Sequence, residues 1–163
     1  MSSPWSSRSL ITRSILVREP RIVMPSLADM VRPSMQTLKH IVVGIIIDAD
    51  DVNPLFGIPS ELEDMRNKNI IETIKISVSN IFGHQDLGDD LEFEWGGLDE
   101  VLTAQGWFSL KRVSLTITIH RVSCSGNLKE MNEAMRKLVL REFPRLSSSN
   151  SVSFNFKLNL LLE

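Results

Sequence analysis

The sequence lacks several features that would assign it to a functional class. Cys124 is the only cysteine, so the chain forms no internal disulfide and has no set of thiolates for a zinc site. It also contains no Asn-x-Ser/Thr acceptor for glycosylation. Both absences favour a protein of a reducing compartment, in the cytoplasm or the nucleus.

Long apolar runs and an excess of one charge are missing as well. The longest apolar stretch, residues 41–47, is interrupted by Gly44 and is far shorter than the roughly 20 residues of a membrane-spanning helix. The formal net charge is −2, whereas proteins that bind nucleic acid or membrane surfaces usually carry a basic excess. We therefore expect no nucleic-acid or membrane partner.

Acidic residues are absent before Glu19, and the first 25 residues are rich in serine and arginine. This composition is typical of an organelle transit peptide, so a mitochondrial location stays open beside the cytoplasm and nucleus. A loose tail, or the cut edge of a longer protein, would have the same composition, and Ile15 and Val17 could form a fraying strand in each case. We expect residues 1–25 to be a flexible segment and residues 26–163 to form the domain.

The rest of the chain alternates helical and strand patterns, at an ordinary composition of 42% hydrophobic and 23% charged residues. Ser26 is placed as an N-cap, and Pro33 limits the helix that follows it. Residues 67–69 should end the second helix, and Phe143 and Pro144 should end the last one. Helical patterns begin near Ser26, Pro59, Gly96 and Asn127, and strand patterns begin near Leu38, Ile71, Leu110 and Val152.

These patterns form a repeat. The leading apolar residues Leu38, Ile71, Leu110 and Leu146 are spaced 33, 39 and 36 residues apart. In the first three units apolar residues recur three, five and seven positions later, whereas a polar insert at 147–151 displaces the fourth. One helix and one strand per unit at this period indicate an α/β fold with a parallel sheet, a leucine-rich-repeat-like solenoid fragment. A compact α/β sandwich with coincidental alternation is the alternative.

The period-two alternation divides each strand into a face under the helices and a face that points outward. The outward face is polar with scattered positive charge, as on the binding surface of a repeat protein, although a merely solvated face would look the same. The first strand departs from this pattern, because Val42 and Ile46 are apolar. The residues that we predict to bind a protein partner are Lys75, Arg112, Ser114, Thr116, Thr118 and His120.

Groups that could carry chemistry do not have the spacing that chemistry needs. Residues 48–53 begin like a calcium loop but have Val52 where an oxygen ligand is required. The loop acids around His84, namely Asp86, Asp89 and Asp90, match no metal-ligand pattern and are typical of a solvated loop. We expect no metal and no cofactor.

Two further groups have an alternative reading. Cys124 and His120 are close in sequence, as a nucleophile and base could be, but no third orienting group is evident. Trp95 and Trp107 bracket the third helix and could anchor an interface, although packing between neighbouring repeats is the simpler interpretation. We expect no catalytic residues.

Five segments resemble a group of uncharacterised basidiomycete fungal proteins described as F-box or leucine-rich-repeat-like. They read NPLFGIPSELEDM at 53–65, NIIETI at 69–74, EWGGLDEVL at 94–102, GWFSLKRVSL at 106–115 and EFPRLSSSNSVSFNF at 142–156. In that group an F-box recruits a ubiquitin-ligase scaffold and the repeats are presumed to hold the substrate. This sequence shows no three-helix F-box pattern, so the resemblance implies the recognition half alone and no catalytic residues.

The sequence therefore predicts a non-enzymatic protein-binding repeat module without its own F-box. Two alternatives stay open: a small α/β enzyme using His120, His84 or the loop acids, and a truncated gene product without independent function. Exposed apolar surface at Val42 and Ile46 would favour the second of these. The identity of the partner and the oligomeric state are not predicted.

Overall fold

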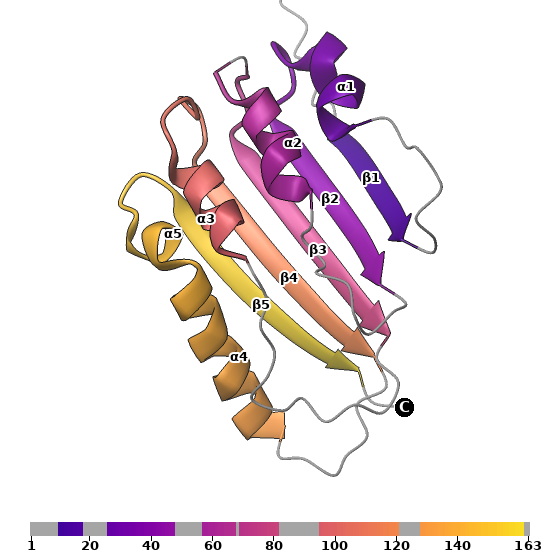
Figure 1. Ribbon diagram of the computed structural model, residues 1–163, viewed down its shortest axis with the longest axis vertical. Coiled ribbons are helices and arrows are strands. Elements are labelled where there is room, and N and C mark those ends of the chain that lie inside the picture. Colours follow the sequence, from indigo (N-terminus) through magenta and orange to yellow (C-terminus); the bar gives the residue numbers. More distant parts are fainter. Residues whose placement is uncertain are drawn as a thin grey trace, which may run out of the picture.

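The computed structural model describes residues 10–17, 26–47, 57–67, 69–81, 95–120 and 128–161. Its centre is one five-stranded sheet in which the strands follow the order of the sequence and every neighbouring pair is parallel (Figure 1). The strands are β1 (Leu10–Val17), β2 (His40–Ile47), β3 (Thr73–Ile81), β4 (Arg112–His120) and β5 (Ser153–Leu161). The predicted α/β class with a parallel sheet is confirmed.

Helices occur between each pair of strands, because a parallel neighbour can be reached only by a crossover. The bounds are α1 (Leu27–Val31), η1 (Arg32–Ser34), α2 (Ile58–Met65), α3 (Gly96–Thr103), α4 (Leu128–Glu142) and α5 (Pro144–Ser148). Figure 1 shows α1, α2, α3 and α5 in a row across one face of the sheet, while α4 runs beside β5. The sheet thus has a covered face and an opposite face.

Local sequence accounts for the first two helices. The Ser26 hydroxyl accepts a hydrogen bond from the backbone N–H of Asp29 at 3.0 Å, as an N-cap does, and Pro33 lies where α1 gives way to the 3-10 turn. Pro59 lies in the first turn of α2, and Asn67 follows that helix in the left-handed region with φ 69°. These predicted starts and stops are confirmed.

The core lies between the helices and the covered face. Ile41, Ile74 and Val113 are at most 1% exposed and are in register on β2, β3 and β4, and Phe154 on β5 continues their row. The residues two and four positions further along each of these three strands are buried as well. The helices close the core with Val31, Leu62, Met65, Leu98 and Leu102. The alternation therefore predicted the covered face of these strands correctly.

The fourth unit differs from its sequence-based prediction. Residues 144–148 form α5 instead of a link, and the residue in register with Val113 is Phe154. Pro144 suits the first helical position, and the buried carboxylate of Asp99 on α3 accepts the backbone N–H groups of Arg145 and Leu146 at 3.0 and 2.8 Å. A cap supplied by another helix leaves no local signal in the sequence.

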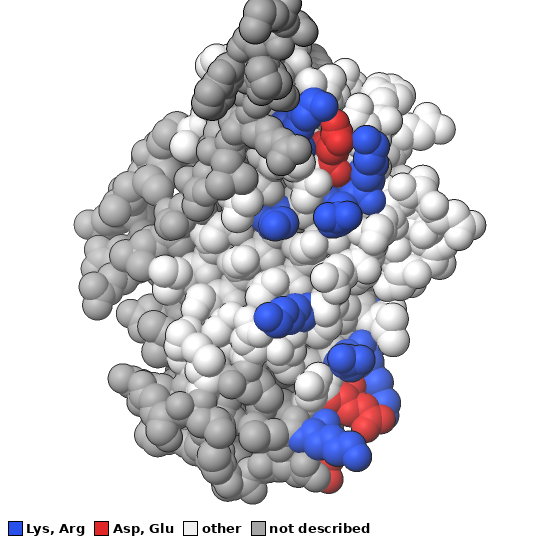
Figure 2. All heavy atoms as spheres, turned by 180° about the vertical axis from the view of Figure 1, so that it is seen from behind, with Lys and Arg blue, Asp and Glu red and all other residues white. Residues whose placement is uncertain are grey.

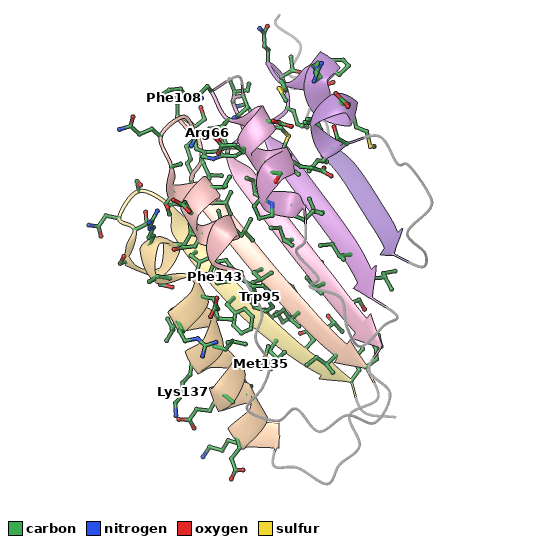
Figure 3. The ribbon with its side chains drawn as sticks, in the orientation of Figure 1. Arg66, Trp95, Phe108, Met135, Lys137 and Phe143 are labelled. Atoms are coloured by element: carbon green, nitrogen blue, oxygen red, sulfur yellow. The ribbon has the colours of Figure 1, made fainter. Side chains whose placement is uncertain are left out.

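Aromatic packing joins α3 to this last unit. The ring of Trp95 lies 6.0 Å from that of Phe143, which in turn lies 5.2 Å from Phe154. Figure 3 shows Trp95 and Phe143 directed into the space between the helices and the sheet. Trp107 is also buried and donates its indole N–H to the carbonyl of Val101 at 2.9 Å. Both tryptophans therefore belong to the core.

The sheet begins earlier than the predicted domain boundary at residue 26. β1 pairs with β2 along its whole length, and Ile11 and Ile15 are in register with Ile41 and Ile45. Arg13 is in register with Val43. The serine and arginine residues of the segment give it the composition of a tail. The remaining parts of segment 1–25, residues 1–9 and 18–25, lie outside the described residues.

Candidate functional site

The face of β2 to β5 opposite the described helices is here called the open face. On β4 the exposure alternates strictly, so that the side chains between the buried residues emerge on this face. Its described members are His40, Val42, Gly44, Ile46, Thr73, Lys75, Ser77, Ser79, Arg112, Ser114, Thr116, Thr118, His120, Ser153, Asn155, Lys157, Asn159 and Leu161. Apart from β2 and Leu161, the open face is polar.

Parallel pairing arranges these residues in rows across the strands. Lys75, Ser114 and Asn155 form one row, because they are direct partners on β3, β4 and β5. The next two rows are Ser77, Thr116 and Lys157, and Ser79, Thr118 and Asn159. Hydroxyl, amide and ammonium groups are therefore held at regular spacings by the backbone of the sheet.

Positive charge on this face has no counterion among the described residues. Lys75, Arg112 and Lys157 are all exposed, and none of them forms an ion pair with another described residue. The open face contains no aspartate or glutamate among its described members. Figure 2 shows separate basic side chains on a largely uncharged surface, with the visible acids at its margins beside basic residues. The open face is thus suited to a negatively charged partner.

Side chains on neighbouring strands also bond to each other. Ser79 Oγ and His120 Nε2 are 2.8 Å apart, and Asn159 Nδ2 donates to Thr118 Oγ1 at 3.3 Å. Each bond joins adjacent strands on the open face, so it fixes the orientation of both groups. Ser79 and His120 also have the proximity that a hydroxyl nucleophile and its base require.

An ion-pair ladder marks the end of the sheet where the strands begin. Glu72 lies between Lys39 and Lys111, with oxygen–nitrogen distances of 2.8 and 3.1 Å. Hydrogen bonds from Lys39 and then Lys111 lower the pKa of the Glu72 carboxyl from 4.5 to about 2. Lys39, Glu72 and Lys111 directly precede β2, β3 and β4, so positive and negative charges alternate across this end of the sheet. The Glu72 carboxylate is therefore already paired with two ammonium groups.

The structure brings the six predicted binding residues to the same face of two neighbouring strands. Lys75 lies on β3, and Arg112, Ser114, Thr116, Thr118 and His120 lie on β4. Sequence reasoning omitted Ser79 and Lys157 from this set, although both occupy outward positions of the same alternation. The period-two pattern does place both of them on the outward face, but the Ser79–His120 hydrogen bond could not be anticipated, since it joins residues 41 positions apart.

Other candidate groups lie outside the described residues. These are the segment 48–53, His84 with Asp86, Asp89 and Asp90, and Cys124. Among the residues that the structure describes, no group of three or more histidine, cysteine, aspartate or glutamate side chains could hold a metal ion. No helix in the described ranges is long and apolar enough to cross a membrane.

Comparisons of the chain with protein-family models, with curated proteins and with solved structures give no match. The geometry and charge of the open face are therefore the basis on which we propose a function.

Proposed function

We propose that this chain is a leucine-rich-repeat-like helix–strand array that binds a protein partner through its open face and catalyses no reaction. The observation that carries the proposal is the set of polar rows on β3, β4 and β5, with Lys75, Arg112 and Lys157 exposed and without a counterion among the described residues. Solvation alone would not need a surface free of acids, whereas a partner with negative charge would be repelled by them.

The scaffold supports this proposal mechanically. The backbone of a parallel sheet is held on both sides by neighbouring strands, so the Cα positions on β3 and β4 are fixed before a partner binds. Binding then costs little backbone entropy, and the ordering cost falls on the exposed lysine and arginine side chains. Repeat proteins with one helix layer and one sheet layer use an extended, uncovered face in this way.

The resemblance to fungal F-box and leucine-rich-repeat-like proteins adds a role to this picture. In those proteins the repeats are presumed to hold the substrate of a ubiquitin ligase, so we propose a substrate-recognition-like module that acts inside the cell. Val42 and Ile46, whose exposure would have favoured a truncated product, are half-buried on β2.

Partner capture from cell lysate tests the proposed function. Thr116 is central in its row, so Thr116→Trp should obstruct the open face without changing its charge. Lys137→Trp is the matched control, because this side chain is 76% exposed on α4 and points away from the sheet (Figure 3). We expect Thr116→Trp to lose specific partners that the control retains. Equal recovery of every bound protein by the two variants would contradict the proposal.

A second candidate function rests on the 2.8 Å contact between Ser79 and His120. A serine hydroxyl hydrogen-bonded to an imidazole is the arrangement from which acyl-transfer enzymes derive a nucleophile. If the pair acts in this way, a fluorophosphonate should label the wild type and should fail to label Ser79→Ala or His120→Gln. Absence of labelling in the wild type would remove this candidate and leave the pair as a cross-strand hydrogen bond.

A further inference from the structure

We infer that the partner presents an acidic, extended segment whose carboxylates pair with Lys75, Arg112 and Lys157. This inference rests on the proposed function and adds the chemical class of the partner. It follows from the positions of the three cations within the sheet and from the absence of acids on the described open face.

The register fixes how far apart the cations are. Lys75 is one strand and two residues from Arg112, so their Cα atoms are separated by about 8 Å at ordinary sheet spacings. Lys157 is one strand and four residues from Arg112, which gives about 14 Å. Lys75 and Lys157 are two strands and two residues apart, or about 12 Å.

An extended peptide has intervals of similar size. Side chains on one side of such a peptide recur about every 7 Å, so carboxylates at alternate positions lie about 7 and 13 Å apart. The Cα positions of the three cations form a triangle and not a line, so the flexible lysine and arginine side chains have to bring their charged groups to the segment. Ser114, Thr116 and Asn155 lie between the cations and can hydrogen-bond the backbone of the segment.

The length of the face also suits an extended segment. Four strands at ordinary spacing cover about 19 Å, and nine residues along a strand cover about 30 Å. An extended segment of about nine residues has the same length, so it can lie along the whole face.

The surface chemistry favours a peptide over nucleic acid. Proteins that bind single strands stack bases on aromatic rings, but the described open face holds no phenylalanine or tryptophan. The net charge of −2 also opposes a polyanion that extends beyond this face. Glu72 would not repel carboxylates strongly, because Lys39 and Lys111 already pair with it at the margin.

The direct test uses a fluorescent peptide of five Glu-Thr repeats. We expect it to bind the wild type, with an affinity that falls as salt is raised, and to bind a Lys75→Glu, Arg112→Glu, Lys157→Glu variant at least tenfold more weakly. The matched control, Arg32→Glu, Arg136→Glu, Arg145→Glu, changes the net charge equally at exposed sites in the helix layer and should stay within twofold of the wild type. A glutamine version of the first variant guards against unfolding caused by charge reversal.

Three outcomes would overturn the acidic partner: no binding of the Glu-Thr peptide, equal weakening by the two triple variants, or tighter binding of oligothymidylate than of the peptide. The Thr116→Trp capture experiment separates this failure from failure of the proposed function. If capture still depends on Thr116, the open face binds a partner of another class. If capture does not depend on Thr116, the proposed function itself fails.

Discussion

At the scale of single residues, two carboxylates stabilise the fold through contacts with residues that are distant in sequence. Asp99 and Glu61 both sit on helices and accept backbone N–H groups from the start of another helix, Asp99 from α5 and Glu61 from Leu27 at 2.5 Å. Each contact joins two helices that belong to different strand-to-strand connections. Helix starts need such partners, because their first N–H groups have none within the helix.

Removal of the Asp99 carboxylate should destabilise the fold. Asp99→Ala leaves the N–H groups of Arg145 and Leu146 without an acceptor in a buried setting, so we expect a loss of about 2 kcal/mol in the free energy of unfolding. Asp99→Asn keeps one acceptor oxygen and should lose about half as much. The change is measured from urea unfolding curves. Glu100→Ala, at an exposed neighbouring site, should stay within about 0.5 kcal/mol of the wild type.

Glu72 should make the stability of the protein sensitive to acid. Its pKa falls from 4.5 to about 2 on folding, so between these values the folded chain binds fewer protons than the unfolded chain. The stabilisation from Glu72 is therefore complete above its ordinary pKa and is lost as the pH falls toward about 2. We expect the difference in unfolding free energy between the wild type and Glu72→Gln to shrink across this window.

The lysines that cause the shift provide the control for this experiment. In a Lys39→Gln, Lys111→Gln background the two ammonium groups are gone, so Glu72→Gln should produce a difference that is nearly independent of pH. A difference that stays constant between about pH 6 and pH 2 in the original background would contradict the ladder as the source of acid sensitivity.

At the scale of elements, the local start and stop signals predicted most boundaries, while contacts from other elements decided the exceptions. Ser26, Pro33 and Asn67 act within a few residues of their own position, so their effects can be recognised in the sequence. α5 and β1 depend on partners that are distant in sequence: the Asp99 side chain for α5 and the edge of β2 for β1. No local pattern identifies such partners.

The turn between α3 and β4 gives an element-level prediction. Gly106 has φ 110°, its carbonyl accepts the N–H of Asn67 at 3.1 Å, and a Cβ there would lie 2.1 Å from Asn67 Oδ1 and 2.7 Å from Arg66 Cγ. Gly106→Ala should therefore cost about 1–3 kcal/mol of unfolding free energy. The same turn holds Phe108 outward with 82% exposure, and Figure 3 shows Phe108 near Arg66 at this end of the molecule.

A second glycine serves as the control for that measurement. Gly96 begins α3, and a Cβ there would meet no atom within 4 Å. Alanine is favoured in helices, so Gly96→Ala should be neutral or stabilising by up to about 1 kcal/mol. Equal unfolding midpoints for the two variants would contradict the tight approach of the α3–β4 turn to Asn67.

At the scale of the whole molecule, the parallel and sequential sheet could be predicted because two independent patterns agree. The repeat places one helix and one strand in each unit, and the alternation within strands assigns the covered and open faces. Ile41, Ile74 and Val113 occupy one row as their offsets in the repeat require. Phe154 joins this row only after the longer connection through α5, which the apolar spacing did not reveal.

The residues of the candidate site could be predicted as far as the period-two alternation of the strands assigns them to one face. Lys75, Arg112 and Thr116 were placed on one face because side chains in a strand alternate. The contacts between strands could not be predicted. Ser79 meets His120, and Glu72 meets Lys111, only after two strands pair in register. The composition of the face therefore follows from the sequence, but its hydrogen bonds and ion pairs follow from the fold.

Site-specific photo-crosslinking in cells tests the central claim most directly, because it reports which face the partner touches. A benzophenone amino acid at Thr116 lies on the open face, and the same group at Lys137 lies on the outer side of α4. We expect a discrete crosslinked species from position 116 that is absent from position 137. Crosslinks from position 137 alone, or the same products from both positions, would contradict the open face as the binding surface.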